Sequence, residues 1–163
     1  MVVLAEDGRI RHDVQLAVAT DPTPGTRAVV DEFLRRLVGG DPEHVAELFA
    51  EKVDWRLDWP ADGHPATPWI RPRSTRAEVA AHFRELAAVH TPHPDPAPGS
   101  PPHTVVEGPH AVVLAELRHT AKPTGKPYTA HCAVHITVEA GHITRYHVYE
   151  DSLSVAQAHT ADA

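Results

Sequence analysis

The chain has 163 residues, enough for one domain with a buried core. Its formal net charge is −7 and it has no basic run, so we do not expect it to bind nucleic acid. Cys132 is the single cysteine, which excludes a disulfide within the chain and a cysteine-rich metal site. No stretch approaches the ~18 apolar residues of a membrane helix, and the first residues do not resemble a secretory signal. We therefore expect a soluble, cytoplasmic protein that does not bind membranes.

The first part of the chain is predicted to stand apart from one larger domain. Residues 1–22 carry apolar residues around the turn signal Asp7–Gly8, which fits either an extra hairpin or a loose arm. Residues 23–163 are predicted to form a single domain. Its first helix opens at Thr23–Pro24, because proline suits a first helical turn, and ends at Gly39–Gly40. The apolar stripe of this helix has helical spacing: Val30, Phe33, Leu34 and Leu37.

Three further elements precede a proline-rich segment. Asp41–Pro42 caps a second, shorter helix with an apolar stripe of Val45, Leu48 and Phe49. The segment from Val53 to Trp59 alternates apolar and charged residues, which predicts a half-buried strand. The four residues from Thr75 to Glu78 form a capping box, so a third helix follows. Residues 91–102 contain six prolines and are predicted to be a loop. The third helix presents one face with Val79, Phe83, Leu86 and His90.

The last part of the chain is predicted to form a sheet, with strands at about 103–107, 110–120, 128–139 and 142–149. A three-residue turn, Glu139–Ala140–Gly141, needs a positive φ only at Gly141, whereas a two-residue turn would also need it at Ala140. The longer turn pairs Val138 with His142. One strand face then carries Cys132, Val134, Ile136, Thr144, Tyr146, Val148 and Glu150. The opposite face carries His131, His135, Arg145, His147 and Tyr149.

Two segments resemble a known family. Residues 138–153 read as a strand, a glycine turn, an aromatic strand and a closing helix. Residues 28–50 contain Gly40–Asp41 and Leu48–Phe49–Ala50 after an opening helix. Both patterns resemble the SnoaL-like and ketosteroid isomerase-like families of the nuclear transport factor 2 superfold. The resemblance covers roughly Thr23 to His159. It implies an α+β cone in which three helices cover the concave face of a curved, mostly antiparallel sheet.

The resemblance implies a pocket but does not fix a reaction, because this fold hosts isomerases, dehydratases, epoxide hydrolases, polyketide cyclases and proteins without chemistry. Ketosteroid isomerases carry a tyrosine where this chain has Phe33, and their general base aligns near Asp58. Epoxide hydrolases carry an aspartate where this chain has Val148. An acid occurs two residues further on, at Glu150.

The catalytic candidates are therefore four charged residues, and each has an alternative role. Glu150 in an apolar pocket would have a raised pKa and could act as acid or base. Its alternative is a surface acid that caps the final helix. Asp58 is either a base or a solvated strand residue. Glu116 and Arg118 either orient a substrate together or form an ion pair on the outer face.

The candidate ligand-binding residues are apolar or aromatic, and ordinary core packing is their alternative role: Phe33, Trp55, Trp59, Trp69, Phe83, Tyr146 and Val148. His82 and His90 lie near the stripe of the third helix and are either bases or hydrogen-bonded core residues. The 14 histidines do not form a metal motif, because His131 and His135 lie four apart on a strand rather than on a helix. We expect neither a metal nor a cofactor.

Two hypotheses for the function follow. The first is a cofactor-independent acid–base enzyme (an isomerase, cyclase or dehydratase) that acts on a small hydrophobic cyclic metabolite, with natural-product biosynthesis as the context that the resemblance implies. The second is a non-catalytic binding or scaffold protein of the same fold, which the missing tyrosine and aspartate favour. The histidine-rich outer strand face further predicts a homodimer that forms through this face.

Overall fold

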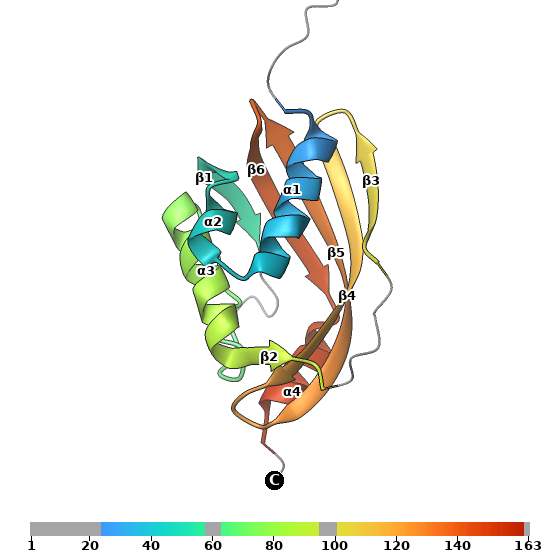
Figure 1. Cartoon of the computed structure of the whole chain (residues 1–163). Helices are drawn as coiled ribbons and strands as arrows, with labels where there is room; N and C mark the ends of the chain where they lie inside the picture. The colour runs from blue at the N-terminus through green and yellow to red at the C-terminus, as the bar shows by residue number, and fades with distance from the viewer. Residues whose placement is uncertain (1–23, 58–62, 95–100, 162–163) are drawn as a thin grey trace, which may run out of the picture.

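The computed structural model describes residues 24–57, 63–94 and 101–161 (Figure 1). The arm predicted for residues 1–22 lies outside these ranges. The helices of the described part are α1 (Thr26–Gly39), α2 (Pro42–Ala46), α3 (Arg76–Val89) and α4 (Ser152–His159). Its strands are β1 (Phe49–Arg56), β2 (His90–Pro92), β3 (His103–Glu107), β4 (His110–Ala121), β5 (Lys126–Glu139) and β6 (His142–Glu150).

The strands form one curved, mixed sheet in the order β1-β6-β5-β4-β2, and β3 pairs with the first part of β4. All pairs are antiparallel except β1 with β6, which is parallel. One edge of β4 holds two short strands in turn: β3 opposite its beginning and β2 opposite its end. In Figure 1 helices α1, α2 and α3 lie over one face of the sheet, and α4 lies at its lower end. This arrangement confirms the predicted cone.

Local sequence signals place the helix ends. Asp41 caps α2 by accepting hydrogen bonds from the backbone of Glu43 and His44, and the capping box of Thr75 and Glu78 begins α3 as predicted. Gly40, with φ 72°, ends α1. Helix α1 begins at Thr26, two residues after the predicted Pro24, because Gly25 occupies the cap position.

Two predicted boundaries were wrong because tertiary pairing decides them. Helix α2 ends at Ala46, and Phe49 is the first residue of β1, where it pairs with Ile143 of β6. The predicted loop over residues 91–102 begins with part of β2, in which Thr91 pairs with Thr120 of β4. A short edge strand can contain Pro92, since an edge residue needs no second hydrogen-bonding partner.

The hairpin between β5 and β6 differs from the prediction at its turn but not in its facing. Ala140 (φ 49°) and Gly141 (φ 77°) both adopt positive φ, so the turn has two residues. The left-handed conformation costs an alanine about 1–2 kcal/mol, but a two-residue turn matches the twist of the paired strands. Thr144 is then an extra residue that forms a bulge in β6. Because of this bulge, Ile143 rather than Thr144 points into the core, and the residues from Arg145 to Glu150 face as predicted.

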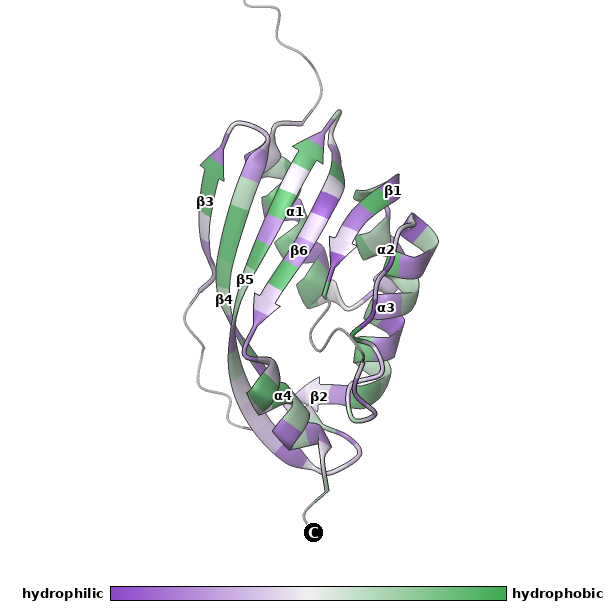
Figure 2. Cartoon of the chain, turned by 180° about the vertical axis from the view of Figure 1, so that it is seen from behind, coloured by the Kyte–Doolittle hydropathy of each residue, from purple (hydrophilic) through white to green (hydrophobic). Residues whose placement is uncertain are grey.

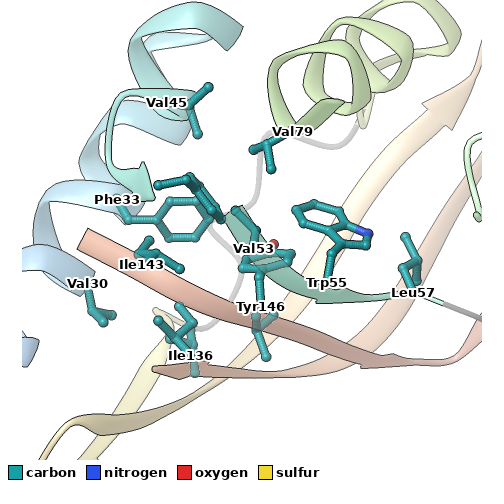
Figure 3. Packing of buried hydrophobic residues seen from close by; sticks show 14 of the residues in the cluster. Val30, Phe33, Val45, Val53, Trp55, Leu57, Val79, Ile136, Ile143 and Tyr146 are labelled. Atoms are coloured by element: carbon teal, nitrogen blue, oxygen red, sulfur yellow. The ribbon is translucent and has the colours of Figure 1, made fainter. Parts of the chain in front are cut away.

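The core lies between the helices and the face of the sheet that they cover, which we call the inner face. Figure 3 shows side chains of α1, α2, α3, β1, β5 and β6 meeting there. Phe33 from α1 is 2% exposed, and Phe49, Ile136 and Ile143 have no measurable exposure. Each such side chain contributes about 1.5–3 kcal/mol by leaving water.

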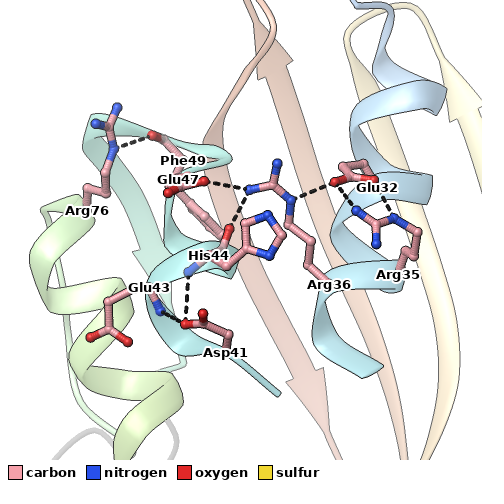
Figure 4. A network of polar contacts seen from close by, with 9 residues as sticks. All are labelled: Glu32, Arg35, Arg36, Asp41, Glu43, His44, Glu47, Phe49 and Arg76. Atoms are coloured by element: carbon pink, nitrogen blue, oxygen red, sulfur yellow. Dashed lines mark hydrogen bonds and ion pairs between the residues drawn. The ribbon is translucent and has the colours of Figure 1, made fainter. Parts of the chain in front are cut away.

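Charged side chains join the helices at the surface (Figure 4). Arg36 of α1 contacts Glu32 in its own helix, and it also contacts the carbonyl of His44 and the carboxylate of Glu47 beyond it. Arg76 at the start of α3 donates to the carbonyl of Phe49 over 2.7 Å. Because these contacts are partly exposed to water, they orient the helices more than they stabilise them.

Candidate functional site

The inner face of β5 and β6 carries the residues that the sequence assigned to a pocket wall. Cys132 lies opposite Glu150, Val134 opposite Val148, and Ile136 opposite Tyr146. Side chains of directly paired residues share a face. The predicted facing of these two strands is therefore confirmed.

The upper part of the inner face is filled by aromatic rings. Trp55 stacks on Tyr146 with ring centroids 4.6 Å apart, and Phe33 meets Tyr146 edge-on at 5.7 Å. Phe83 lies 6.4 Å from Trp55. The structure thus brings four predicted ligand-binding residues together, but as a packed core (Figure 3). A ligand must enter beyond them.

An open cavity of about 680 Å³ lies beyond this aromatic core, where β1 and β6 end and α4 begins. Leu57, Val148 and Glu150 contribute to its wall from the inner side of the strands. On this inner side two apolar side chains accompany one carboxyl group, an arrangement that suits a hydrophobic ligand with one reactive position. The other lining residues are Arg56, His147, Tyr149, Asp151, Ser152 and Leu153.

Glu150 is a half-buried carboxyl group in this wall. Burial raises its pKa above the ordinary value, and the neighbouring charge of Asp151 raises it further. A weak hydrogen bond from Ser152 Oγ to Glu150 Oε1, 3.4 Å long, acts in the opposite direction. Burial raises the pKa of Cys132 to about 11 and also raises the pKa of Tyr128, and the charge of Glu150 adds to both increases. The carboxyl group therefore lies beside un-ionised groups rather than cations, where it can hold or release a proton.

A second polar group closes the lower end of the cone. His90 Nδ1 lies 3.0 Å from the carbonyl oxygen of Leu86, so this nitrogen donates and His90 Nε2 is left as an acceptor. His159 Nε2 of α4 lies 3.0 Å from His90 Nε2 and supplies the proton between them. The ring of Trp69, another predicted ligand-binding residue, packs edge-on against both imidazoles. Burial lowers the pKa of His90 to about 4, so the pair is neutral near pH 7.

Two more residues belong to this lower group. The rings of His119 and Tyr128 lie 5.2 and 5.9 Å from His90, and their strand positions are paired on the inner face. Neither His119, Tyr128 nor His159 was singled out from the sequence. The alternation of apolar residues along residues 110–120 could have indicated the inward facing of His119, but nothing local to His159 indicates its contacts. Within the described ranges, no set of three or more His, Cys, Asp or Glu residues has a geometry that could hold a metal ion.

The comparison with known proteins agrees with this fold. Residues 30–146 match the SnoaL-like domain family. The chain belongs to the SnoaL-like family. No curated protein matches it. Within the described residues, no helix is long and apolar enough to cross a membrane.

Solved structures with the same fold include proteins with different assigned roles. A nuclear transport factor 2-like protein from Burkholderia xenovorans is 22% identical, with a TM-score of 0.68 over 83% of this chain and 95% of its own. A candidate polyketide cyclase from Pseudomonas putida is 12% identical, with a TM-score of 0.67 over 83% of this chain and 98% of its own. A candidate isomerase from Bacillus subtilis is 16% identical, with a TM-score of 0.67 over 82% of this chain and 91% of its own. At these identities the likeness establishes the fold alone.

Two of the remaining predicted catalytic residues, Glu116 and Arg118, are not among the residues that line this cavity. Glu116 and Arg118 pair with β5 on the face opposite the core, which we call the outer face, and their charged atoms lie 3.6 Å apart. This is the ion pair that the sequence left as the alternative to a role in the pocket. Asp58 and Trp59 lie outside the described residues.

The outer face carries a second polar network. Asp54 of β1 accepts a hydrogen bond of 2.9 Å from Arg145 Nε, and His147 Nε2 lies 3.0 Å from the other carboxylate oxygen. The rings of His110, His135 and His147 follow one another across the sheet at 5.4 and 6.1 Å. His147 also lines the open cavity, whereas Asp54, Arg145, His110 and His135 are not among its lining residues. Most of this network therefore serves the outer surface.

Proposed function

We propose that this SnoaL-like protein is a cofactor-independent acid–base enzyme that acts on a small hydrophobic cyclic compound, with Glu150 as the residue that moves the proton. The position of Glu150 carries the proposal: a half-buried carboxyl group with a raised pKa in the wall of an open cavity, next to the apolar side chains of Leu57 and Val148. Enzymes use such environments to bring the pKa of a carboxyl group closer to the working pH.

The chemistry open to this site is removal and return of a proton at carbon. Ionised Glu150 can take a proton from a carbon next to a carbonyl group, and the protonated form can return it elsewhere on the ring. Isomerisation, cyclisation and dehydration share this step. The candidate isomerase and polyketide cyclase of the same fold support a reaction of this class, and the latter supports natural-product biosynthesis as its context.

A probe of general-base activity tests the proposal without knowledge of the substrate. The aromatic compound 5-nitrobenzisoxazole opens when a base removes its ring proton and the N–O bond breaks, which gives a coloured phenolate. We expect Glu150→Gln to lower the rate at least about 100-fold, as for loss of a general base, while Glu107→Gln on the exposed edge strand leaves it unchanged. The wild-type rate should rise with pH, with a midpoint above 4.5, as Glu150 ionises.

Equal rates for wild type and Glu150→Gln would contradict the proposal, and Asp58→Asn would then show whether that residue is the base. The second candidate function, a non-catalytic binding protein, is favoured by Phe33, whose ring offers no hydrogen bond to a developing oxyanion. A co-purified ligand in native mass spectrometry, together with no proton transfer to or from any bound probe, would support this second function.

A further inference from the structure

Two buried rings between α3 and β1 carry polar atoms without partners. Trp55 Nε1 and His82 Nδ1 make no hydrogen bond with any part of the chain that the structure describes. Trp55 is 4% exposed and His82 is 3% exposed, and their ring centroids are 4.8 Å apart. An unpaired buried polar atom costs about 1–3 kcal/mol, so two neighbouring ones require an explanation.

The two atoms have opposite hydrogen-bonding characters. An indole N–H can only donate. The backbone carbonyl of Trp69 interacts with the imidazole of His82, and burial lowers the pKa of this ring to about 3, so it is neutral. The single ring proton is therefore on the nitrogen that faces this carbonyl, Nε2, and His82 Nδ1 is an acceptor. A donor and an acceptor thus belong to two rings whose centroids are 4.8 Å apart.

The position of the Trp55 nitrogen connects this pair to the cavity. In Figure 3 the indole nitrogen lies at the end of the ring nearer Leu57, away from Phe33. Leu57 directly follows the last residue of β1, is buried, and lines the cavity that contains Glu150. Trp55 Nε1 is therefore on the side of the aromatic core that leads toward the cavity.

We propose that Trp55 and His82 form the polar end of the ligand pocket and bind a hydroxyl group of the cyclic ligand. The hydroxyl oxygen accepts from Trp55 Nε1–H while its own O–H donates to His82 Nδ1. An alcohol, a phenol or an enol can do both, whereas a ketone or an ether can only accept. This inference rests on the proposed function for the ligand, but it concerns binding rather than the proton transfer at Glu150.

Three related probes separate these hydrogen bonds: 2-naphthol, which donates and accepts; 2-methoxynaphthalene, which only accepts; and naphthalene, which does neither. The chain has three tryptophans, so a ¹⁵N-labelled sample gives at most three indole N–H signals, and Trp55→Phe identifies the one of interest. We expect 2-naphthol to move the Trp55 signal downfield and naphthalene to leave its shift nearly unchanged. Binding of 2-naphthol should be roughly 3- to 10-fold tighter than that of 2-methoxynaphthalene, the factor for one neutral hydrogen bond.

Matched variants test the two residues separately. His82→Phe should remove the preference for 2-naphthol over 2-methoxynaphthalene, and Trp55→Phe should remove the preference for 2-methoxynaphthalene over naphthalene. His103→Phe, a substitution of an exposed histidine in β3, should keep both. An unmoved Trp55 signal, or equal affinity of the wild type for all three compounds, would overturn the inference and indicate that a permanently bound water satisfies the two atoms.

The outcomes distinguish this inference from the proposed function. If Glu150→Gln abolishes proton abstraction while 2-naphthol leaves the Trp55 signal in place, the catalytic proposal stands and the hydroxyl subsite falls. If 2-naphthol moves the signal while Glu150→Gln keeps its activity, the subsite stands and the catalytic role of Glu150 falls.

Discussion

Histidines lie on both faces of the same sheet, and the two sets have different surroundings. On the inner side, His82, His90 and His119 pack against aromatic rings, and burial lowers the pKa of each. On the outer face, the ring of His147 lies beside the carboxylate of Asp54, and His110 contacts the Thr137 hydroxyl. The same residue type is thus a neutral core component on one side and part of a polar network with other side chains on the other.

The outer face also carries apolar side chains that a monomer leaves in water. Val105, Leu114 and Tyr149 are 52, 47 and 63% exposed, and Figure 2 colours parts of β3 and β4 as hydrophobic. Exposed apolar residues beside histidines and arginine are typical of a surface that meets another protein surface. We therefore propose that the inner face provides stability and binds the ligand, and that the outer face mediates association.

The largest effect should come from breaking the inner core. Phe33→Ala removes a ring that contacts Phe49, Phe83 and Tyr146, so we expect the free energy of unfolding to fall by about 3–5 kcal/mol. Urea denaturation measures this change. Leu37→Ala, one turn further along the same helix but 36% exposed, is the control and should cost far less. Similar losses for both variants would show that Phe33 is not central to the core.

Acid should destabilise the protein through the inner histidines. The folded chain holds His90 with a pKa of about 4, whereas the unfolded ring takes up a proton near 6.5. The neutral ring therefore contributes stability above pH 6.5, and this contribution is lost as the pH falls toward 4. We expect the free energy of unfolding, measured in urea between pH 7.5 and 5, to fall less steeply for His90→Gln than for the wild type. The exposed His103→Gln should keep the wild-type slope, and equal slopes for all three proteins would contradict the role of burial.

Glu150 should reduce stability at neutral pH. Burial raises its folded-state pKa, so the protonated form favours folding at low pH, and this advantage is lost as the pH rises through the raised pKa. Glu150→Gln should therefore be more stable than the wild type at pH 8, and the difference should shrink at pH 4.5. Urea unfolding at both values measures it. A variant less stable than the wild type at pH 8 would indicate that the carboxylate is well solvated.

The smallest effect concerns the outer face, through which we propose that two copies associate. Burial and the nearby positive charge of Arg145 lower the pKa of His135, so neutral imidazoles favour contact and protonated ones oppose it. His110 and His147 flank His135, and Asp54 offsets part of the positive charge. Association should weaken between pH 7.5 and 5.5.

Sedimentation velocity at these two pH values tests the proposed dimer. Leu114→Asp on the outer face should weaken it at both, and Val38→Asp on α1, which is 90% exposed, should not. A monomer at pH 7.5 would show that the outer face has another purpose. A dimer equally tight at both values would remove only the part played by the histidines.

The sequence predicted the elements well where short local signals define them. The capping box at Thr75, the left-handed glycine at Gly40 and the cap at Asp41 satisfy backbone groups within a few residues, so a sequence pattern is sufficient. It failed at Phe49, whose place in β1 depends on pairing with a residue almost a hundred positions away.

The pocket could be predicted only in part for a similar reason. Side chains alternate between the two faces of a strand, so Tyr146, Val148 and Glu150 lie on the same face. Once the facing of one of them was predicted correctly, the facing of the other two followed. The contact of His90 with His159 joins the end of α3 to the last turn of α4, and neither position belongs to a recognisable motif. The partnerless atoms of Trp55 and His82 depend on packing, which the order of residues does not reveal.

The bulge at Thr144 makes this protein more sensitive to the length of β6 than to its composition. Every residue from Arg145 to Glu150 owes its facing to that one additional residue. We expect deletion of Thr144 alone to turn Tyr146 and Glu150 toward the outer face and Arg145 and His147 toward the core. No substitution elsewhere in the chain would be needed for this change. A substitution in this strand therefore changes one side chain, whereas an insertion or deletion between the turn and the pocket changes the facing of every residue after it.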